Sequence, residues 1–186
     1  MPLSLQLGLF YLISELLLTV TRRSRSRTGT RQDQSTLGVL WLVIMASVAA
    51  GVFVARYWLA AALPDGQMFA SVAVVLFVAG LFLRWWAIIV LGRFFTVDVT
   101  IEKDHELVER GPFRVLRHPS YAGVLLAFVG FALSLGNWAA LLVVLLPIFA
   151  VFIHRMDVEE QALSRALGSS YVDYMKRTNR LVPFVY

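Results

Sequence analysis

Cysteine is absent from this 186-residue chain. Its absence excludes disulfide bonds, thiolate nucleophiles and cysteine-ligated metal sites. Charged residues are also scarce at 16%, whereas hydrophobic residues make up 59% of the chain. A soluble domain of this length needs a polar surface around its core, and this composition does not supply one. The sequence therefore predicts an integral membrane protein.

Several motifs of soluble enzymes are missing as well. The glycines form neither a phosphate-binding loop nor the glycine-rich pattern of Rossmann-type methyltransferases, and no G-x-S-x-G nucleophile elbow occurs. The histidines at 105, 118 and 154 lack the close spacing of metal ligands. We expect no bound metal, although a zinc site built from these histidines and nearby carboxylates stays open as an alternative. Any nucleoside cofactor must be held by other means.

Five apolar stretches are long enough, or nearly long enough, to cross a membrane as helices. The last two are short and are joined by Gly136-Asn137, which indicates a tight helical hairpin. The pattern predicts an all-α integral membrane protein with about five transmembrane helices in a single domain, residues 1–186. The predicted spans are residues 3–20, 37–63, 68–91, 122–135 and 138–154.

The basic residues predict how the chain is oriented. Fifteen of the seventeen lysines and arginines lie within residues 22–31, 92–120 and 155–180. Five spans place these three segments on one side of the membrane, and the positive-inside rule makes that side cytoplasmic. We therefore interpret the arginines at 22–31 as a topology signal, not as a nucleic-acid site, and we expect no nucleic-acid partner. The net charge of +5 favours contact with anionic lipids.

Two ionisable residues lie within predicted spans. Arg84 is inside the third span, where such a residue is a functional candidate. Equally, its side chain could snorkel toward the interface beside Trp85 and Trp86. Glu15 is the single charge of the first span and lies near its arginine-rich end, where it could pair with a cation or reach the headgroups.

The hairpin brings two distant polar segments together, because it leaves from Tyr121 and returns at Arg155. Pro119 suits a first helical turn, so His118 would cap that helix, with Tyr121 one turn inward. Arg155 and Glu159 share a helix face by their i, i+4 spacing. Separately, these are an ordinary helix start and an ordinary surface ion pair. Together they predict a pocket for a zwitterionic cofactor or a charged lipid headgroup, with residues His105, His118, Tyr121, Arg155 and Glu159.

One arrangement of motifs over about residues 93–184 is more specific. It reads His105-Glu106-Leu107-Val108, Gly111-Pro112-Phe113, Arg117-His118-Pro119-Ser120-Tyr121, then Arg155, Glu159-Glu160 and Leu167-Gly168 with Tyr171 and Tyr174. This arrangement resembles the isoprenylcysteine carboxyl methyltransferase family and the related membrane phospholipid methyltransferases. The first two spans resemble that family only in being hydrophobic.

The resemblance implies a methyltransferase that uses S-adenosylmethionine and releases S-adenosylhomocysteine. Its catalytic region would cover about residues 93–180, with a cytosolic cofactor pocket formed by the loop before the fourth helix and by the C-terminal helix. Arg155 matches the residue that orients the substrate carboxylate. Phe113 replaces a common tyrosine of the family, and Asp98 loosely matches a polar cofactor contact. The implied cofactor-binding residues are His105, Glu106, Leu107, Val108, Phe113, His118, Pro119, Ser120, Tyr121 and Glu159.

Four functions stay open at this point. The first is carboxyl O-methylation of an isoprenylcysteine-like or other amphiphilic lipid, which needs no general base because a carboxylate is already nucleophilic. The second is N-methylation of a phospholipid headgroup amine, which favours a nearby base. A non-catalytic scaffold or transporter-like protein is the third, and a cofactor-dependent reductase the fourth. The compact form indicates a multi-pass protein of a prokaryotic plasma membrane.

Overall fold

The computed structural model describes residues 1–21, 30–31, 34–64, 66–95, 100–101 and 107–183. The described part of the chain folds into five apolar helices and a short polar one. The helices are α1 (Leu3–Thr21), α2 (Gln34–Tyr57), α3 (Gly66–Leu91), α4 (Pro119–Ser134), α5 (Trp138–Leu167) and α6 (Ser169–Arg177). Strand β1 (Thr30–Arg31) pairs antiparallel with β2 (Thr100–Ile101). Short 3-10 helices are η1 (Leu59–Ala61), η2 (Gly92–Phe94) and η3 (Gly111–Arg114).

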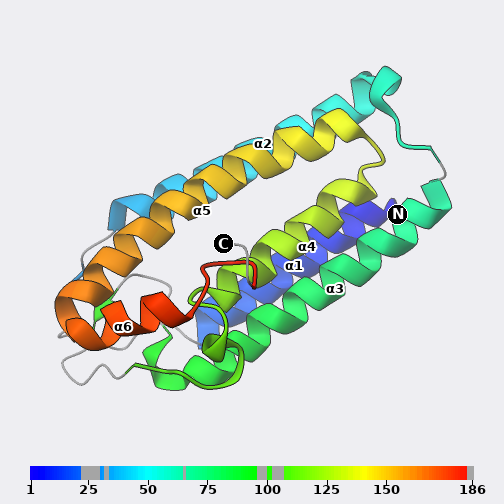
Figure 1. Cartoon of the computed structure of the whole chain (residues 1–186). Coiled ribbons are helices and arrows are strands. Elements are labelled where there is room, and N and C mark those ends of the chain that lie inside the picture. The colour runs from blue at the N-terminus through cyan, green and yellow to red at the C-terminus, as the bar shows by residue number, and fades with distance from the viewer. Residues whose placement is uncertain (22–29, 32–33, 65, 96–99, 102–106, 184–186) are drawn as a thin grey trace.

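The apolar helices form two layers (Figure 1). Helices α1, α3 and α4 lie together in one layer, and α2 and α5 form the other. Their shared core includes Leu7, Ile44, Phe77, Phe131 and Ile148, one residue from each helix. At one end of the bundle, α6 and η3 lie beside the start of α4 (Figure 1).

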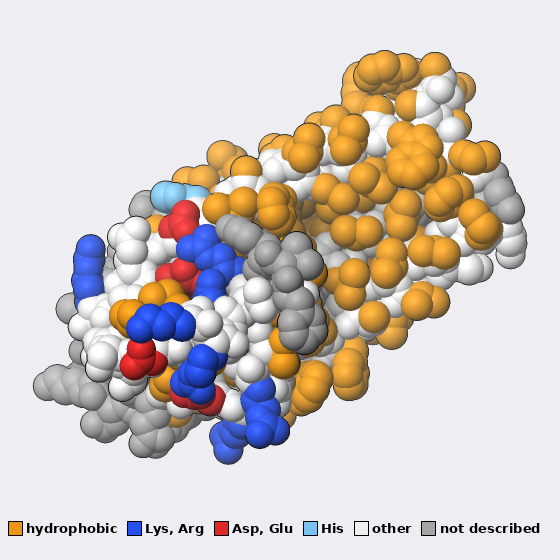
Figure 2. Space-filling model, in the orientation of Figure 1, with side chains coloured by type: hydrophobic (Ala, Val, Ile, Leu, Met, Phe, Trp, Pro, Cys, Tyr) orange, Lys and Arg blue, Asp and Glu red, His pale blue; other side chains and the backbone are white. Residues whose placement is uncertain are grey.

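Apolar side chains also cover the outside of the bundle. Phe10, Leu42, Phe82 and Leu146 are exposed on four different helices. Figure 2 shows this apolar surface along the helices and the charged side chains gathered at one end. Three helical segments, Gly38–Tyr57, Gln67–Leu91 and Trp138–Leu167, are long and apolar enough to cross a membrane, and α1 and α4 are shorter apolar helices. These features are those of a multi-pass integral membrane protein.

Helices α3 and α4 pack backbone to backbone because glycines lie where they cross. A Cβ atom on Gly80 would overlap the backbone nitrogen of Ala127, and one on Gly123 would lie 2.6 Å from the backbone nitrogen of Arg84. Small residues allow this close approach within a membrane, where packing has to replace the hydrophobic driving force. The crossing therefore brings Arg84 against the first turns of α4.

The hairpin between α4 and α5 is present. Asn137 caps α5 by accepting a hydrogen bond from the backbone nitrogen of Ala140 at 3.0 Å, and Gly136 takes a positive φ of 67°. The predicted end of the fifth helical span at residue 154 is not the end of the helix. Helix α5 continues without a break to Leu167, because Met156 and Ala162 extend its buried face into the charged part. The predicted second span was also too long, since α2 ends at Tyr57.

Candidate functional site

The first turn of α4 carries two of the predicted site residues. His118 is the N-cap residue and Pro119 the first helical residue, and both are buried. The His118 ring stacks on that of Tyr121, with centroids 5.4 Å apart and planes inclined by 5°. The expectation that His118 caps the helix and that Tyr121 shares its face is confirmed.

Arg155, Tyr121 and Glu159 form one hydrogen-bonded chain between α4 and α5. Arg155 Nε donates to the Tyr121 hydroxyl at 3.0 Å, and this hydroxyl donates to Glu159 Oε2 at 2.7 Å. The His118 Nδ1 atom lies 3.8 Å from the same Glu159 oxygen. The convergence of the two segments is therefore as predicted. The position of a tyrosine hydroxyl between arginine and glutamate is new, because helical spacing alone indicated a direct ion pair.

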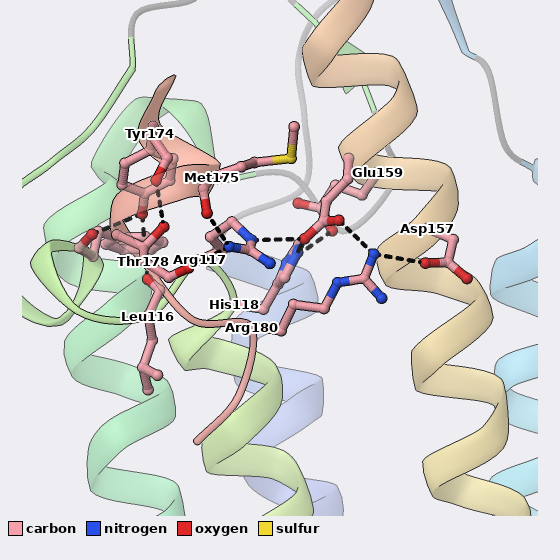
Figure 3. A network of polar contacts seen from close by, with 11 residues as sticks. Leu116, Arg117, His118, Asp157, Glu159, Tyr174, Met175, Thr178 and Arg180 are labelled. Carbon is pink, nitrogen blue, oxygen red and sulfur yellow. Dashed lines mark hydrogen bonds and ion pairs between the residues drawn. The ribbon is translucent and has the colours of Figure 1, made fainter. Parts of the chain in front are cut away.

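A second network surrounds Glu160, and Figure 3 labels its partners Arg117, His118 and Arg180. His118 Nε2 lies 3.1 Å from Glu160 Oε1, and Arg117 Nε donates to the same oxygen at 2.9 Å. Arg180 donates to Glu160 Oε2 at 2.6 Å and lies 2.8 Å from an oxygen of Asp157. The imidazole of His118 thus lies between the carboxylates of the two adjacent glutamates.

The Glu160 carboxyl lies in the charged part of α5, beyond the predicted span. Burial alone would raise its pKa, but hydrogen bonds from His118, Arg180 and Arg117 outweigh burial and lower the pKa to about 2. At neutral pH the Glu160 carboxylate is therefore charged, and each of its oxygens has a hydrogen-bonding partner. It is unsuited to accept a proton during catalysis.

The C-terminal segment holds the loop before α4. Arg117 donates to the backbone oxygens of Met175, at 2.8 Å, and Thr178 (Figure 3). The backbone nitrogen of His118 donates to the backbone oxygen of Arg180 at 3.1 Å. The Tyr174 hydroxyl donates to the Phe113 backbone oxygen at 2.7 Å. The resemblance implied that the C-terminal helix forms part of the pocket, but it did not indicate these contacts with the loop before α4.

The remaining predicted site residues are less directly connected to this cluster. Phe113 is buried in η3, and the Ser120 hydroxyl accepts a hydrogen bond from Arg84 at 3.1 Å. Leu107 and Val108 are half-buried in the segment that leads into η3. Three residues named from the sequence lie outside the described part of the chain: Asp98, His105 and Glu106.

Two further expectations concerned charged residues. Among the described residues, no group of three or more His, Asp or Glu side chains is arranged to hold a metal ion. Snorkelling of Arg84 is wrong, because its side chain is 11% exposed and forms an ion pair with Glu15 at 2.7 Å. Glu15 thus pairs with a cation inside the bundle.

An apolar cavity of about 110 Å³ lies between the two helix layers. Its wall includes Tyr11 of α1, Trp41 of α2, Phe77 of α3 and Phe128 of α4. The Tyr11 and Phe128 rings are 5.0 Å apart. Farther along α4, Tyr121 contacts Phe152 of α5 with ring centroids 5.1 Å apart. Both the polar cluster and the cavity thus adjoin α4, with aromatic side chains beside each.

Known proteins are similar to this chain in sequence and in fold. The protein-S-isoprenylcysteine O-methyltransferase B of Arabidopsis thaliana is 36% identical over 110 residues, which cover 58% of this chain and 56% of that protein. The Schizosaccharomyces pombe enzyme of the same name is 33% identical over 108 residues, covering 57% of this chain and 46% of the relative. The chain thus spans about half the length of these curated relatives.

A solved structure shares the fold of nearly the whole chain. The eukaryotic intramembrane Ras methyltransferase ICMT matches with a TM-score of 0.68 and 22% sequence identity, over 99% of this chain and 68% of that one. The family model of the phospholipid methyltransferases matches residues 68–170, which is more than half of the chain. This match includes α3 from residue 68 onward, the hairpin and the Arg155–Glu159 part of the site. The chain belongs to the phospholipid methyltransferase family.

Proposed function

We propose that this protein is a membrane methyltransferase that transfers a methyl group from S-adenosylmethionine to the carboxylate of an isoprenylcysteine-like or other amphiphilic lipid. The observation that carries the proposal is the Arg155–Tyr121–Glu159 chain, in which an arginine that is 4% exposed lies at the polar end of an apolar bundle. Family membership and the names of the relatives support methyl transfer.

The residues of the cluster fit the cofactor. When bound, S-adenosylmethionine supplies a methyl group already activated by a sulfonium. Its amino-acid part is a zwitterion, and the cluster offers a partly exposed carboxylate at Glu159 near the buried Arg155. Glu159 and His118 would hold this part, with Tyr121 and Pro119 beside them. By resemblance, His105, Glu106, Leu107, Val108, Phe113 and Ser120 complete the pocket.

Arg155 would hold the acceptor carboxylate. A guanidinium stays charged and has fixed donor geometry, so it can orient a carboxylate without taking up a proton. Its hydrogen bond to the Tyr121 hydroxyl restricts the rotation of the side chain. Because the carboxylate is already a nucleophile, in-line placement supplies most of the rate enhancement and no general base is needed.

The apolar cavity supports an amphiphilic acceptor. A lipid chain could enter between helices from the bilayer, with its polar head at the Arg155 end of α5 and its tail near Trp41 and Phe128. We infer that the site faces the cytoplasm. The positive-inside rule places the basic segments at 92–120 and 155–180 in the cytoplasm, and most residues of the site belong to these segments.

N-Methylation of a phospholipid headgroup amine is the second candidate, favoured by the family description. An amine must lose its proton before attack, and Glu160 is a poor base because its pKa is lowered to about 2. Glu159 or His118 would then have to act, although Glu159 already accepts a hydrogen bond from Tyr121. The occupied carboxylates therefore favour the carboxyl acceptor.

The test is methyl transfer from radiolabelled S-adenosylmethionine in detergent or vesicles. A farnesyl-cysteine analogue and total membrane lipids serve as acceptors in parallel reactions. We expect a base-labile methyl ester on the cysteine analogue, and an Arg155→Lys variant that loses most of its kcat/KM. A base-stable product on lipids would support the amine candidate instead. Folded protein that fails to bind S-adenosylhomocysteine would refute both candidates.

A further inference from the structure

A buried ion pair connects α1 with α3 and reaches the first turn of α4. Arg84 Nη2 donates to Glu15 Oε2 at 2.7 Å, and Arg84 Nε lies 2.7 Å from Glu15 Oε1. The third nitrogen, Nη1, donates to the Ser120 hydroxyl at 3.1 Å. The Arg84 and Glu15 side chains are 11% and 10% exposed. Two nitrogens of this guanidinium are thus hydrogen-bonded, to Glu15 and to Ser120, and the third is in ion-pair contact with Glu15.

Stability alone does not explain such a pair. Removing two charges from water costs several kcal/mol per ion, and apolar residues of similar volume often serve equally well or better. The third contact is more informative. Ser120 directly precedes Tyr121, whose hydroxyl links Arg155 to Glu159. Arg84 of α3 therefore contacts the first turn of α4. The same turn carries Tyr121, which contacts the candidate-site residues of α5.

Close packing of α3 against α4 fixes the position of Arg84 relative to Ser120. A Cβ atom on Gly123 would lie 2.6 Å from the Arg84 backbone nitrogen, so the two helices cannot slide here without a clash or a gap. The ion pair with Glu15 then restrains the guanidinium from the α1 side. The Ser120 hydroxyl receives its hydrogen bond from a group held in place by two other helices.

We propose that Glu15 and Arg84 are a positioning pair for the candidate active site. Glu15 orients the Arg84 guanidinium, which holds Ser120 and with it the first turn of α4. His118 and Tyr121 thereby keep their orientation toward α5. Neither member of the pair touches the acceptor carboxylate. The kinetic part of this inference rests on the proposed methyltransferase function.

The decisive variant is the double substitution Glu15→Leu/Arg84→Met, which replaces the ion pair by apolar side chains. Because the core is refilled, we expect an unchanged or raised unfolding temperature. We expect kcat to fall between about tenfold and a hundredfold, because small displacements of positioning groups cost this much. Full kcat in this variant would show that the pair is merely structural and would overturn the proposal.

A matched control lies beside the pair. Trp85 Nε1 donates to the Ser14 hydroxyl at 2.9 Å, which is also a polar link between α1 and α3. The substitution Ser14→Ala/Trp85→Phe removes this link, which is not a contact to α4, and we expect kcat to stay within about twofold of the unmodified protein. An equal loss of kcat in the control would mean that any weakening of α1–α3 contacts lowers activity, against the proposal.

A double-mutant cycle tests the route through Ser120. Arg84→Lys keeps the charge but cannot satisfy Glu15 and Ser120 with the same fork geometry. If Arg84 acts through Ser120, the loss of kcat in Arg84→Lys/Ser120→Ala should equal that of the larger single variant. Losses that multiply would show independent roles and would overturn this route.

A readout that needs no enzymatic activity separates this proposal from the proposed function. Because the chain has no cysteine, Ala122→Cys places a single thiol in the first turn of α4. We expect a maleimide reagent to label it several-fold faster in the Glu15→Leu/Arg84→Met background than in the Ser14→Ala/Trp85→Phe background. If labelling is faster but the unmodified protein transfers no methyl group, the positioning role of the pair is supported and the proposed methyltransferase function is refuted. Equal labelling rates would refute the pair.

Discussion

At the scale of single residues, Tyr121 connects the two halves of the candidate site. Its ring stacks on His118 and contacts Phe152, while its hydroxyl accepts from Arg155 and donates to Glu159. A tyrosine is suited to this position because its apolar body packs between helices and its polar end reaches a partner. The hydroxyl therefore sets the orientation of both the guanidinium and the carboxylate.

Replacing Tyr121 by Phe tests this arrangement. The change keeps the ring but removes a hydrogen-bonding partner from the buried Arg155 and from Glu159. We expect kcat/KM for the carboxylate acceptor to fall between about tenfold and a hundredfold. Steady-state methyl-transfer kinetics measure this, and Tyr57→Phe, at an exposed tyrosine, is the control. An unchanged kcat/KM would exclude the hydroxyl from the mechanism.

The Glu160 carboxylate makes stability depend on pH. Its pKa falls from 4.5 to about 2 because the contacts of His118, Arg180 and Arg117 outweigh burial. The lowered pKa stabilises the fold above pH 4.5, and this stabilisation is lost as the pH falls toward 2. We expect Glu160→Gln to unfold a few degrees below the unmodified protein at pH 6 and at nearly the same temperature near pH 2. A constant difference in thermal-unfolding midpoint across this range would contradict the assignment.

At the scale of elements, two devices position the site. Helix α5 extends beyond its apolar section and carries Arg155, Glu159 and Glu160 on one rigid support. The C-terminal segment then holds the loop before α4 through the backbone of Asn179 and Arg180, and the Arg180 side chain binds Glu160 of α5. Both devices fix the charged residues relative to the helix ends, which is a requirement for a preorganised site.

Arg180→Ala tests the C-terminal device. The change leaves Glu160 and Asp157 without their bond to this guanidinium, so we expect a lower unfolding temperature and several-fold weaker binding of S-adenosylhomocysteine. The matched control is Lys176→Ala, which breaks an ion pair exposed at 70% and 64% and so should change little. Calorimetry on detergent-solubilised protein measures both quantities. Equal effects in the two variants would argue against a positioning role of the Arg180 contacts.

The close contact of α3 and α4 gives a second prediction at this scale. Gly123→Ala places a Cβ atom against the backbone of Arg84, so the helices must separate. We expect destabilisation of about 1–3 kcal/mol. Gly38→Ala is the control, because a Cβ atom there meets nothing within 4 Å. Thermal unfolding in detergent compares the two, and equal midpoints would contradict the close packing.

At the scale of the whole molecule, an apolar surface along the helices and a charged end are the features of a multi-pass membrane protein (Figure 2). The cavity between the two layers lies within the apolar part and adjoins α4, whose first turn belongs to the polar cluster. An amphiphilic molecule would satisfy both regions at once. A change in the size of the cavity should then affect binding of the lipid chain more than reaction of the polar head.

Gly8→Leu tests this division by filling the cavity from α1. We expect a raised KM for a farnesylated acceptor, with little change for a short-chain acceptor or for S-adenosylhomocysteine binding. Gly38→Leu serves as the control on α2. A loss of activity that is equal for long and short acceptors would indicate damage to the fold and not to a lipid-chain site.

The sequence by itself determined the membrane class, the helical hairpin and the meeting of His118 and Tyr121 with Arg155 and Glu159. The length of an apolar stretch specifies a membrane-spanning helix. A two-residue turn makes the next helix run back antiparallel to the one before it. The tight hairpin therefore fixed which segments meet. The Asp98–Glu106 part of the motif lies partly outside the described residues, so those roles stay predictions.

Only the tertiary structure decided which polar groups are partners. Arg84 pairs with Glu15 across 69 positions, Arg155 reaches Tyr121 across 34, and Arg180 binds Glu160 across 20. Each pairing depends on how every helix is rotated about its own axis and where the chain returns after α6. Side-chain spacing along one helix does not contain that information, because rotation is set by packing such as the Gly80–Gly123 crossing.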